Sequence, residues 1–388
     1  MKKKILVVTS SRADFGILSN LIYLINKEKK LKLKLVITGS HLSKKKHSSS
    51  LEINNLKIKN KKILNINFKN NNLDDTINIF SNSITKFKET YSSNKPDLII
   101  ILGDRFEIFA AALAAFFYRI PLAHIHGGEV TIGAFDDAIR HSITKLSNFH
   151  FVTNKEHFKR VKQLGENTKN IYLVGSLSSE NIKKNINKTK NQIEDKFNLK
   201  LKKKNLLITF HPVTLQKDFG KKDYIKILSV LKGFKKYGII FTSSNYDTNN
   251  NFFTRKTKAF VRKNKNAYLV ENFGKDYYFS ILKIINCMIG NSSSGILESP
   301  AFKLPVINIG NRQDGRFKNK NIISLKSNFR KNELIKKINQ AISLKFAKKL
   351  KKIKDLNYRS NSSFKIIKII KKLDLKKVKL KKFYDIKF

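Results

Sequence analysis

Short apolar runs alternate with helix-period stretches along most of this 388-residue chain, and this rhythm constrains the fold more than any other feature. The clearest run is Asp97–Leu102, which is almost continuously apolar, as expected for a central parallel strand that is buried on both faces. In Asp74–Tyr91, by contrast, apolar residues recur every three or four positions, which predicts an amphipathic helix. Strands and helices in alternation are typical of a doubly wound parallel sheet, so we predict an α/β fold.

The alternation occurs twice, which predicts two Rossmann-like halves. Strands are expected in the first half at Ile5–Thr9, Leu35–Thr38, Ile63–Phe68, Asp97–Leu102, Ile120–Ile125 and Phe149–Thr153. Strands are expected in the second half at Leu206–Phe210, Gly238–Thr242, Ala267–Val270, Cys287–Gly290 and Pro305–Ile309. Helices of the first half are expected at Leu18–Asn26, Asp74–Tyr91, Phe106–Tyr118 and Asp136–Leu146.

A polar Lys/Asn-rich stretch over residues 181–204 lies between the two halves and is expected to form a surface helix and loop. We predict an N-terminal domain over residues 1–175 that carries the acid–base groups and a nucleotide-binding domain over 176–350. The Lys-rich remainder, 351–388, is predicted to be a helix or tail that packs back on the first domain. A ligand cleft is expected between the two domains.

The formal net charge of +52 is unevenly distributed. No lysine occurs from Pro96 to Thr144, a stretch that holds the carboxylates Asp97, Asp104, Glu107, Glu129, Asp136 and Asp137. Elsewhere, most lysine runs lack interleaved aromatic residues that would stack on bases. We interpret the charge as a solvated surface around an acidic site and expect no nucleic-acid partner; a polyanion-binding patch is the alternative.

The single cysteine, Cys287, excludes an intrachain disulfide and a multi-cysteine metal site. Apolar runs such as Ile108–Phe117 are too short to span a bilayer. The apolar stretch after the basic N-terminus ends after about five residues, short of the roughly 7–15 of a secretory signal. We therefore expect a cytoplasmic protein with no membrane partner.

Ligands bind such sheets in the loops that leave the carboxyl ends of the strands, and the first two such loops carry charged groups. Ser10–Gly16 combines small residues with Arg12, which suits a phosphate, although an ordinary strand–helix turn is the alternative. The loop lacks a GxGxxG pattern, so no dinucleotide cofactor is predicted. Gly103–Glu107 places Asp104 at the end of the most apolar strand, either in a ligand site or as the N-cap of the next helix.

The densest group of chemically active side chains lies in residues 124–141. It contains His124, His126, Glu129, Asp136, Asp137 and His141. Paired carboxylates in a closed site can take different pKa values and so supply an acid and a base. Histidine and carboxylate also suit zinc or iron, but the two histidines lie two apart on a strand before a Gly-Gly turn, so we predict no metal. Asp136 and Asp137 could alternatively cap the helix that follows.

The fourth loop is Ser-rich and follows the predicted strand Cys287–Gly290. Ser292, Ser293 and Ser294 open a predicted helix and could cradle a phosphate, while Glu298 could accept both hydroxyls of a ribose. His211 follows another predicted strand of the same half. The second half is therefore predicted to hold a nucleotide.

Together, these stretches resemble the UDP-N-acetylglucosamine 2-epimerase family, within it the hydrolysing branch that makes N-acetylmannosamine for sialic-acid synthesis. The resemblance extends from Ile5 to about Arg316. It is carried by Gly103–Glu107, His124–Thr144, Phe210–Thr214, Gly290–Glu298 and Asn308–Gln313. It implies a GT-B-like pair of Rossmann-like domains, a homodimer or homotetramer, a UDP-linked sugar as substrate, and no nicotinamide or metal cofactor.

The resemblance also implies a hydrolytic reaction. A base removes the C2 proton while the nucleotide leaves C1, and water then adds to the resulting 2-acetamidoglucal with inverted configuration at C2. The matching catalytic positions are Asp104, Glu129, Asp136, Asp137 and His211. His126 stands where family members often carry a glutamate, so acid and base stay unassigned. The matching substrate-binding positions are Arg12, His41, Arg105, His124, His126, Arg140, Asn245, Ser292, Ser293, Ser294, Glu298 and Arg312.

Three other functions stay open at this point. The same chemistry on UDP- or GDP-N,N'-diacetylbacillosamine, on the legionaminic-acid route, involves nearly the same motifs. A GT-B glycosyltransferase would use the same nucleotide site, but it needs no group that abstracts a C2 proton, and the segment 124–141 disfavours it. A basic nucleic-acid-binding protein is the last alternative.

Overall fold

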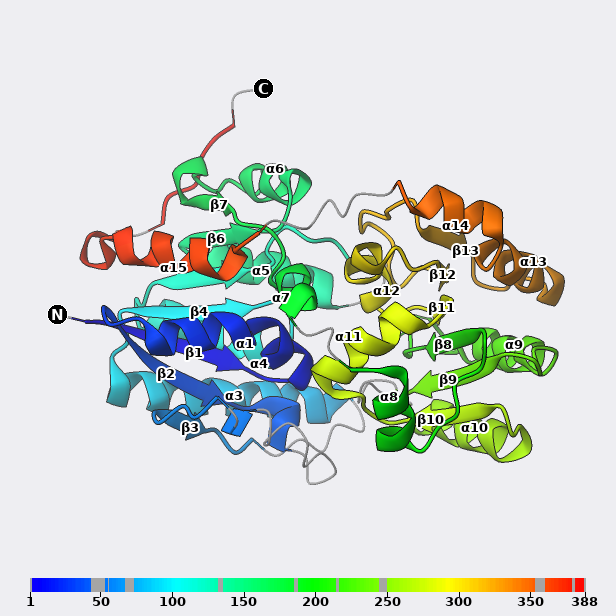
Figure 1. Ribbon diagram of the computed structural model, residues 1–388. Coiled ribbons are helices and arrows are strands. Elements are labelled where there is room, and N and C mark those ends of the chain that lie inside the picture. The colour runs from blue at the N-terminus through cyan, green and yellow to red at the C-terminus, as the bar shows by residue number, and fades with distance from the viewer. Residues whose placement is uncertain are drawn as a thin grey trace. The chain divides into compact units, whose positions relative to one another are not determined.

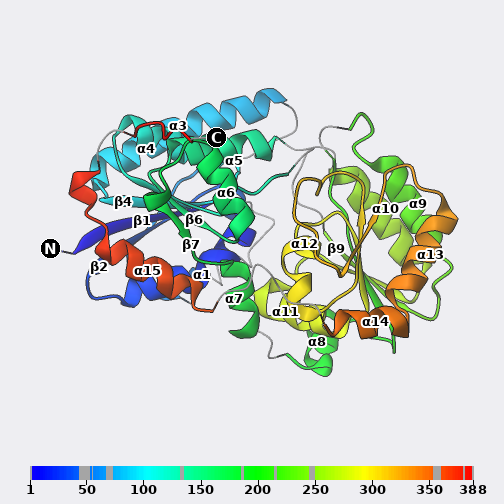
Figure 2. The same cartoon turned by 90° about the horizontal axis from the view of Figure 1, so that it is seen from above.

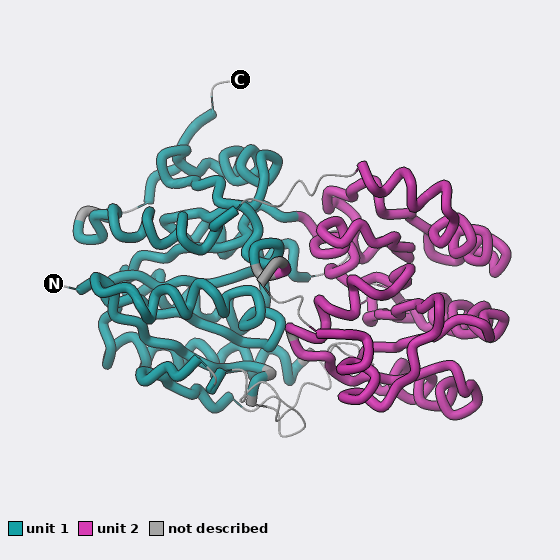
Figure 3. Tube along the Cα trace, in the orientation of Figure 1, with its two compact units in different colours: residues 1–129, 135–181, 357–388 teal, residues 130–134, 182–356 magenta. Residues whose placement is uncertain are grey.

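The computed structural model describes residues 2–42, 53–54, 56–66, 73–131, 135–184, 188–213, 216–243, 250–352, 360–378 and 381–386. The chain forms two compact units (Figure 3). Unit 1 comprises residues 1–129, 135–181 and 357–388, and unit 2 comprises 130–134 and 182–356. The chain therefore leaves unit 1 at residue 130, returns at 135, and returns again at 357. The sequence-based division into 1–175, 176–350 and 351–388 did not place residues 130–134 with unit 2.

Unit 1 is built on a seven-stranded sheet with the order β3-β2-β1-β4-β5-β6-β7, in which neighbouring strands are parallel (Figures 1 and 2). Its strands are β1 (Lys3–Thr9), β2 (Leu31–Ile37), β3 (Lys61–Ile63), β4 (Leu98–Leu102), β5 (Leu122–Ile125), β6 (Phe149–Val152) and β7 (Ile171–Leu173). The helical elements of this part are α1 (Arg12–Lys27), η1 (Gly39–Leu42), α3 (Leu73–Asn94), α4 (Phe106–Phe117), α5 (Asp136–Leu146), α6 (Lys155–Gln163), η2 (Thr168–Asn170), α15 (Ser362–Lys372) and η4 (Leu375–Lys377). The helix α7 (Leu177–Lys184) begins in unit 1 and ends in unit 2.

Alternate residues of the first strand supply two separate cores. Ile5 and Val7 of β1 pack in a cluster with buried residues of α1 and α15. Leu6 and Val8 pack in a second cluster with α4 and with Phe87 of α3. Because successive side chains of a strand point to opposite faces, each face of the sheet has its own helical cover.

Unit 2 repeats this plan with a six-stranded sheet of order β10-β9-β8-β11-β12-β13, again with parallel neighbours. Its strands are β8 (Asn205–Thr209), β9 (Gly238–Thr242), β10 (Ala267–Val270), β11 (Cys287–Gly290), β12 (Val306–Ile309) and β13 (Ile322–Leu325). The helical elements are α8 (Lys190–Phe197), α9 (Lys221–Leu231), α10 (Asn250–Lys263), α11 (Gly274–Ile284), α12 (Ser294–Leu297), η3 (Ser299–Phe302), α13 (Lys331–Ala341) and α14 (Leu344–Leu350). None of the helices in the described ranges is both long enough and apolar enough to cross a membrane.

The predicted α/β fold with two doubly wound sheets is confirmed. Of the predicted first-half strands, only Ile63–Phe68 is misplaced: β3 ends at Ile63 and residues 64–66 are not strand. The strands β7 and β13 were not predicted from the sequence; both are short strands at an edge of their sheet. Within the Lys/Asn-rich stretch, α8 buries Ile193, so this part is more than a surface connection.

The C-terminal helix α15 is fastened to unit 1 at both ends. At its start, the Glu180 carboxylate accepts hydrogen bonds from the Ser363 backbone N–H and hydroxyl, at 2.9 and 2.6 Å. At its end, the Lys3 ammonium donates to the carbonyls of Ile370, Lys371 and Leu373. A negative group at a helix start and a positive group at its end both match the helix dipole. This segment is therefore an integral part of unit 1.

Candidate functional site

The polar loops singled out in the sequence gather at the places where each sheet reverses its strand order. In unit 1, β1 and β4 are neighbours although the chain visits β2 and β3 between them. In unit 2, β8 and β11 have the same relationship. Ligands of open α/β sheets bind outside the carboxyl ends of the strands at such reversals. The loops that follow β1, β4, β8 and β11 are therefore candidate site loops.

Asp104, directly after β4, is held by an arginine of α5. The predicted N-cap role of Asp104 is wrong, because the N-cap of α4 is Arg105 and no side chain caps the helix. The Asp104 carboxylate instead forms an ion pair with the guanidinium of Arg140 on α5. Arg140 also donates to the Glu129 carbonyl at 3.0 Å and lies 3.7 Å from the Asp137 carboxylate.

The exposure of these groups differs sharply. The Arg140 side chain is 2% exposed, whereas those of Asp104 and Asp137 are 22% and 29% exposed. A buried cation that is bonded on several sides is fixed in place, while the two carboxylates beside it keep contact with solvent. The arrangement can present carboxylate oxygens to a ligand in a defined orientation.

His124 links the end of β4 to α5. Its Nε2–H donates to the Gly103 carbonyl at 2.8 Å, and its Nδ1 lies 3.1 Å from the Thr144 hydroxyl. The side chain is fully buried, and burial lowers the pKa of His124 to about 3, so the ring is neutral. Both ring nitrogens thus have partners within the protein. The geometry gives His124 a positioning role beside Asp104.

The Gly-Gly turn after β5 brings His126 and Glu129 together. The His126 backbone is left-handed, with φ 66°, and its Nδ1 lies 3.2 Å from a Glu129 carboxylate oxygen. Both side chains are buried. The turn requires glycine at position 128, because φ is +79° and an added Cβ would lie 2.5 Å from the His157 carbonyl oxygen. A tight turn thus encloses a carboxylate–imidazole pair.

The start of α5 does not use its aspartates as side-chain caps. The N-cap is Phe135, which makes no side-chain cap bond, so neither Asp136 nor Asp137 is the N-cap; both lie in the first turn, where a negative charge matches the helix dipole. The Asp137 carboxylate is 3.6 Å from His141 Nε2. Burial lowers the pKa of His141, against the opposing effect of Asp137. Asp137 therefore stands between a buried guanidinium and an imidazole.

The loop after β1 is a capping box and not an open cradle. Ser11 is the N-cap of α1, and the Asp14 carboxylate accepts from the hydroxyls of Ser10 and Ser11 at 2.7 and 2.6 Å. Arg12 is the first residue of this helix. The Thr9 hydroxyl lies 3.0 Å from Nε2 of His41, which is buried in η1. Burial lowers the pKa of His41 to about 4.

Arg105 has a partner that the sequence did not suggest. Its guanidinium donates to the carboxylate of Glu107 at 2.9 Å, and Glu107 is fully buried. A buried carboxylate next to this guanidinium fixes the direction of the Arg105 side chain. Glu107 is therefore a supporting residue for a predicted substrate-binding arginine.

In unit 2, His211 and Asn291 bridge the strand reversal. The His211 backbone N–H donates to the Asn291 side-chain oxygen at 2.6 Å, and the Asn291 amide donates to the His211 carbonyl at 2.8 Å. The Asn291 carbonyl in turn accepts from Arg312 and Gln313, at 3.3 and 2.9 Å. Burial lowers the pKa of His211 to about 3, so its ring is neutral. Asn291 and Gln313 are buried organising residues absent from the sequence-based site list.

The Ser-rich loop after β11 opens a helix that is much shorter than expected. α12 has only four residues, Ser294–Leu297, and η3 follows, so the predicted helix-terminus cradle for a phosphate has little helix behind it. Ser294 shares its hydroxyl with the Glu298 carboxylate and with the Tyr278 hydroxyl, the latter at 2.6 Å. Tyr278 is a further residue of this group, and burial raises its pKa.

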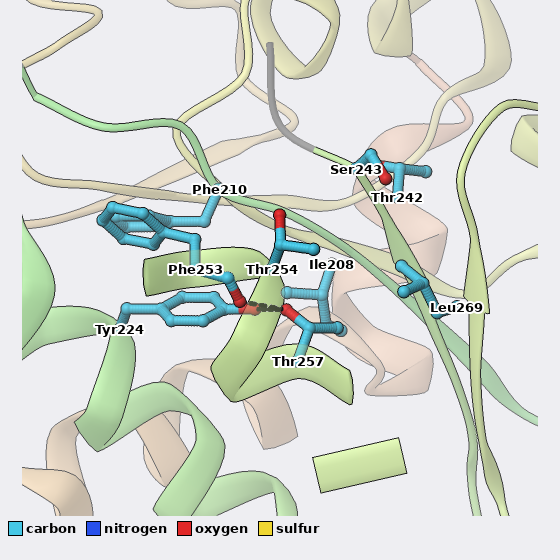
Figure 4. A pocket seen from close by; sticks show the side chains of 9 residues that line it. All are labelled: Ile208, Phe210, Tyr224, Thr242, Ser243, Phe253, Thr254, Thr257 and Leu269. Carbon is cyan, nitrogen blue, oxygen red and sulfur yellow. Dashed lines mark hydrogen bonds between the residues drawn. The ribbon is translucent and has the colours of Figure 1, made fainter. Parts of the chain in front are cut away.

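A narrow pocket, with room for about one water molecule, lies beside the end of β8 (Figure 4). Aromatic rings of Phe210, Tyr224 and Phe253 form one side of it, and the Tyr224 hydroxyl lies 2.5 Å from the Thr257 hydroxyl. Phe210 and Phe253 stack at 5.9 Å. We interpret this aromatic cluster as the support that fixes the end of β8.

One predicted site residue could not be located. Asn245, like Thr214 in the matched stretch after β8, lies outside the described residues. Within the residues that the structure describes, no three His, Cys, Asp or Glu side chains are grouped so that they could hold a metal ion.

Comparison with known proteins decides the family. A family model described as UDP-N-acetylglucosamine 2-epimerase matches residues 24–371. The chain belongs to this epimerase family. The predicted resemblance, including its hydrolysing branch, is confirmed by the relatives described next.

Two curated relatives of this 2-epimerase family member cover most of its length. It is 40% identical to the GDP/UDP-N,N'-diacetylbacillosamine 2-epimerase (hydrolyzing) of Campylobacter jejuni, over 84% of this chain and 85% of that protein. It is 35% identical to the polysialic acid biosynthesis protein P7 of Escherichia coli, over 99% of this chain and 98% of that protein.

Solved structures agree on the fold of the 2-epimerase chain. The UDP-N-acetylglucosamine 2-epimerase of Neisseria meningitidis, solved with UDP-N-acetylglucosamine, superposes with a TM-score of 0.80 and 20% identity. The match covers 95% of this chain and all of that one. The predicted GT-B-like class of fold is thereby confirmed.

Proposed function

We propose that this protein is a hydrolysing sugar-nucleotide 2-epimerase that converts UDP-N-acetylglucosamine into UDP and N-acetylmannosamine. One observation carries the proposal: in a member of this family, Arg140 holds two partly exposed carboxylates, Asp104 and Asp137, at the carboxyl end of the central strands. Removal of a C2 proton needs a fixed, charged base, and this group supplies one.

In this proposal, the reaction proceeds by elimination followed by hydration. The base takes the C2 proton, the C1–O bond to the diphosphate breaks, and a C1=C2 double bond forms. Water then adds its hydroxyl to C1, and a proton returns to C2 from the opposite face. Each step needs one group that accepts a proton and another that gives one.

Exposure supports Asp104 as the proton acceptor. Its side chain is 22% exposed and ion-paired to a buried guanidinium, which fixes the direction of the carboxylate. Asp137, at 29% exposed, is our first choice for the second group, ahead of Glu129, whose side chain is 5% exposed and paired with His126. Asp136 is the remaining candidate in the same segment.

We propose that arginine side chains and neutral hydrogen-bond donors bind the diphosphate of the departing nucleotide. Arg12, Arg105 and Arg312 are the proposed phosphate contacts, because guanidinium groups bind phosphate oxygens in a bidentate manner. A neutral His211 can donate an N–H to the leaving diphosphate, and this hydrogen bond strengthens as negative charge develops. Further proposed substrate contacts are His41, His126, Ser292, Ser293, Ser294 and Glu298. His124 and Arg140, which the sequence also predicted to contact the substrate, are buried and bonded within the protein, so we propose that they position Asp104 instead.

A second substrate is favoured by a specific observation. The relative that is 40% identical bears the name GDP/UDP-N,N'-diacetylbacillosamine 2-epimerase (hydrolyzing). The same elimination and hydration apply to that sugar, because the bonds broken at C1 and C2 are the same. A homodimeric or homotetrameric state stays a prediction from the family resemblance, and a cytoplasmic location stays a prediction from the sequence.

The test is to incubate the protein in D2O with UDP-N-acetylglucosamine, and separately with UDP- and GDP-N,N'-diacetylbacillosamine, and to follow the products by NMR. Release of the nucleoside diphosphate with deuterium at C2 is the expected result, and the larger kcat/KM identifies the substrate. A C2 epimer that remains attached to the nucleotide would contradict the hydrolytic step. Transfer of the sugar to an acceptor without deuterium at C2 would instead indicate a glycosyltransferase.

A further inference from the structure

The C-terminal segment 381–386 contacts the C-terminal end of α5 within unit 1. The Lys381 ammonium donates to the carbonyls of Thr144, Lys145 and Ser147, at 3.0, 2.7 and 2.6 Å. The last carbonyls of a helix have no partners in the helix and carry its partial negative charge. Lys381 thus caps the C-terminal end of α5, the helix that carries Arg140.

This lysine is itself held by a buried carboxylate. Glu166 lies 2.6 Å from the Lys381 ammonium and 2.8 Å from that of Lys145. The Glu166 side chain is almost fully buried and also lies 3.0 Å from His150 Nε2. An ion pair with a buried partner resists screening by salt, so Lys381 is fixed in direction.

The backbone next to Lys381 is also attached. The Tyr384 backbone N–H donates to the Gly165 carbonyl at 3.0 Å. The Phe383 ring occupies the space where a side chain at Gly165 would lie, since an added Cβ would be 2.4 Å from that ring. The Lys145 ammonium lies 4.9 Å from the centre of the same ring. The contact is therefore made by several neighbouring residues.

From Lys381, hydrogen bonds lead to the candidate site. Thr144, whose carbonyl accepts from Lys381, places its hydroxyl 3.1 Å from His124 Nδ1 and 3.1 Å from the Arg140 carbonyl. His124 donates to the carbonyl of Gly103, the residue before Asp104. Both partners of the Asp104–Arg140 ion pair are thus connected to the lysine by one polar network.

We propose that Lys381 is a positioning residue, which holds the end of α5 so that Arg140 orients Asp104 for proton abstraction. The proposal rests on the proposed function, because it assigns Lys381 a part in the same reaction. It also predicts a structural effect that can be measured without any substrate.

The charges around Lys381 predict a pH dependence. Glu166 from the turn after α6, Lys145 from α5 and His150 from β6 face it, and the fully buried His124 lies in the same network. Burial lowers the pKa of Lys381 to about 8, against the effect of Glu166. Lys381 therefore loses its charge as the pH rises through about 8.

Loss of the Lys381 proton is expected to change stability and activity in opposite directions. In the unfolded chain, the lysine keeps its proton up to its ordinary pKa of 10.5. Between about pH 8 and this value, the unfolded state binds more protons, so the contribution of Lys381 to stability rises with pH. We expect activity to fall in this range while the protein remains folded. Circular dichroism over the same pH range checks that the protein remains folded while activity falls.

Three variants test the proposal: Lys381→Met, Lys381→Arg, and Lys382→Met as a matched control at an exposed neighbouring position. Lys381→Met is expected to lower kcat roughly ten- to a hundredfold with little change in KM, as expected for a misplaced catalytic group. Lys381→Arg should restore kcat and move the alkaline fall in activity to higher pH. Lys382→Met should behave as the wild type.

Hydrogen–deuterium exchange of the peptide that spans residues 141–148 supplies the readout without substrate. Exchange should be faster in Lys381→Met than in Lys382→Met, and Glu166→Gln offers a second route to the same change if Lys381→Met folds poorly. Equal exchange in the two lysine variants, or equal kcat, overturns the proposal. If the wild type releases no nucleotide from any of the three substrates, the proposed function fails, and the exchange experiment still decides the contact.

Discussion

The guanidinium of Arg140 meets the carboxylate of Asp104 although the two residues belong to different strand–helix units. Asp104 follows β4, and Arg140 lies on α5 after the neighbouring strand β5. The pairing of these strands brings the two residues together, and Arg140 is almost completely buried.

Replacement of Asp104 tests its role in the chemistry. Asp104→Asn retains the shape and a hydrogen-bond acceptor for Arg140 but removes the base, so we expect kcat to fall by a factor of roughly 10²–10⁴. Circular dichroism should show a folded protein. Asp97→Asn, just before the other end of the same strand, is the control and should retain activity; its carboxylate accepts a hydrogen bond from the Lys4 backbone N–H at 2.7 Å. Near-normal turnover of Asp104→Asn would remove Asp104 from the mechanism.

Removal of the Arg140 charge should affect the fold as well. Arg140→Met leaves Asp104 and the Glu129 carbonyl without their shared donor, and loss of one member of a buried ion pair costs about 3 kcal/mol. The free energy of unfolding, measured by urea denaturation, should fall by this order. Lys159→Met removes an exposed partner of Glu156 and is expected to change stability by less than about 1 kcal/mol. Equal losses for the two variants would be inconsistent with a structural role of Arg140.

Two glycine replacements should have opposite signs. Gly128→Ala forces a left-handed φ of +79° on alanine and brings its Cβ to 2.5 Å from the His157 carbonyl oxygen, so a loss of more than about 1 kcal/mol is expected. Gly16→Ala lies in α1, where an added Cβ meets no atom within 4 Å, and should stabilise the protein by about 1 kcal/mol. Urea denaturation of both variants measures the difference, and a tolerated Gly128→Ala would contradict the described turn.

The buried histidines predict a loss of stability in mild acid. The pKa values of His124 and His211 are lowered from 6.5 to about 3, so the unfolded state binds more protons between these limits. Stability is therefore fully present above pH 6.5 and falls as the pH drops, by about 1 kcal/mol per histidine per pH unit. Urea denaturation at pH 7.5 and 5.0 checks this, and His124→Gln should show a shallower dependence. An unchanged dependence in His124→Gln would show that this residue does not contribute.

The sequence was sufficient for the layout of both sheets, because buried parallel strands are apolar on both faces and leave a clear signal in Asp97–Leu102 and its counterparts. The loops chosen from the sequence do follow strands at the reversals of strand order, since strand ends carry the polar residues; their part in a site stays a prediction. The edge strands β7 and β13 were missed because three or four residues do not establish a period.

The partners of the site residues could not be read from the sequence. Asp104 and Asp137 were each consistent with a helix cap, and only the tertiary contact with Arg140 separates the alternatives. Glu107 accepts a hydrogen bond from Arg105, and Asn291 accepts one from His211; such contacts leave no local sequence pattern. The contact between Lys381 and α5 joins distant parts of the chain, so sequence periodicity could not indicate it.

The attachment of α15 to unit 1 affects the order in which the protein can be completed during synthesis. Residues 182–356 of unit 2 leave the ribosome before α15, whose buried Ile366 and Ile370 belong to the core under β1. Unit 2 can therefore fold first, while part of the apolar core of unit 1 is still exposed. This reverses the usual sequence, in which the N-terminal domain folds first. The nascent chain is thus expected to depend on chaperones that shield the sheet face of unit 1 until translation ends.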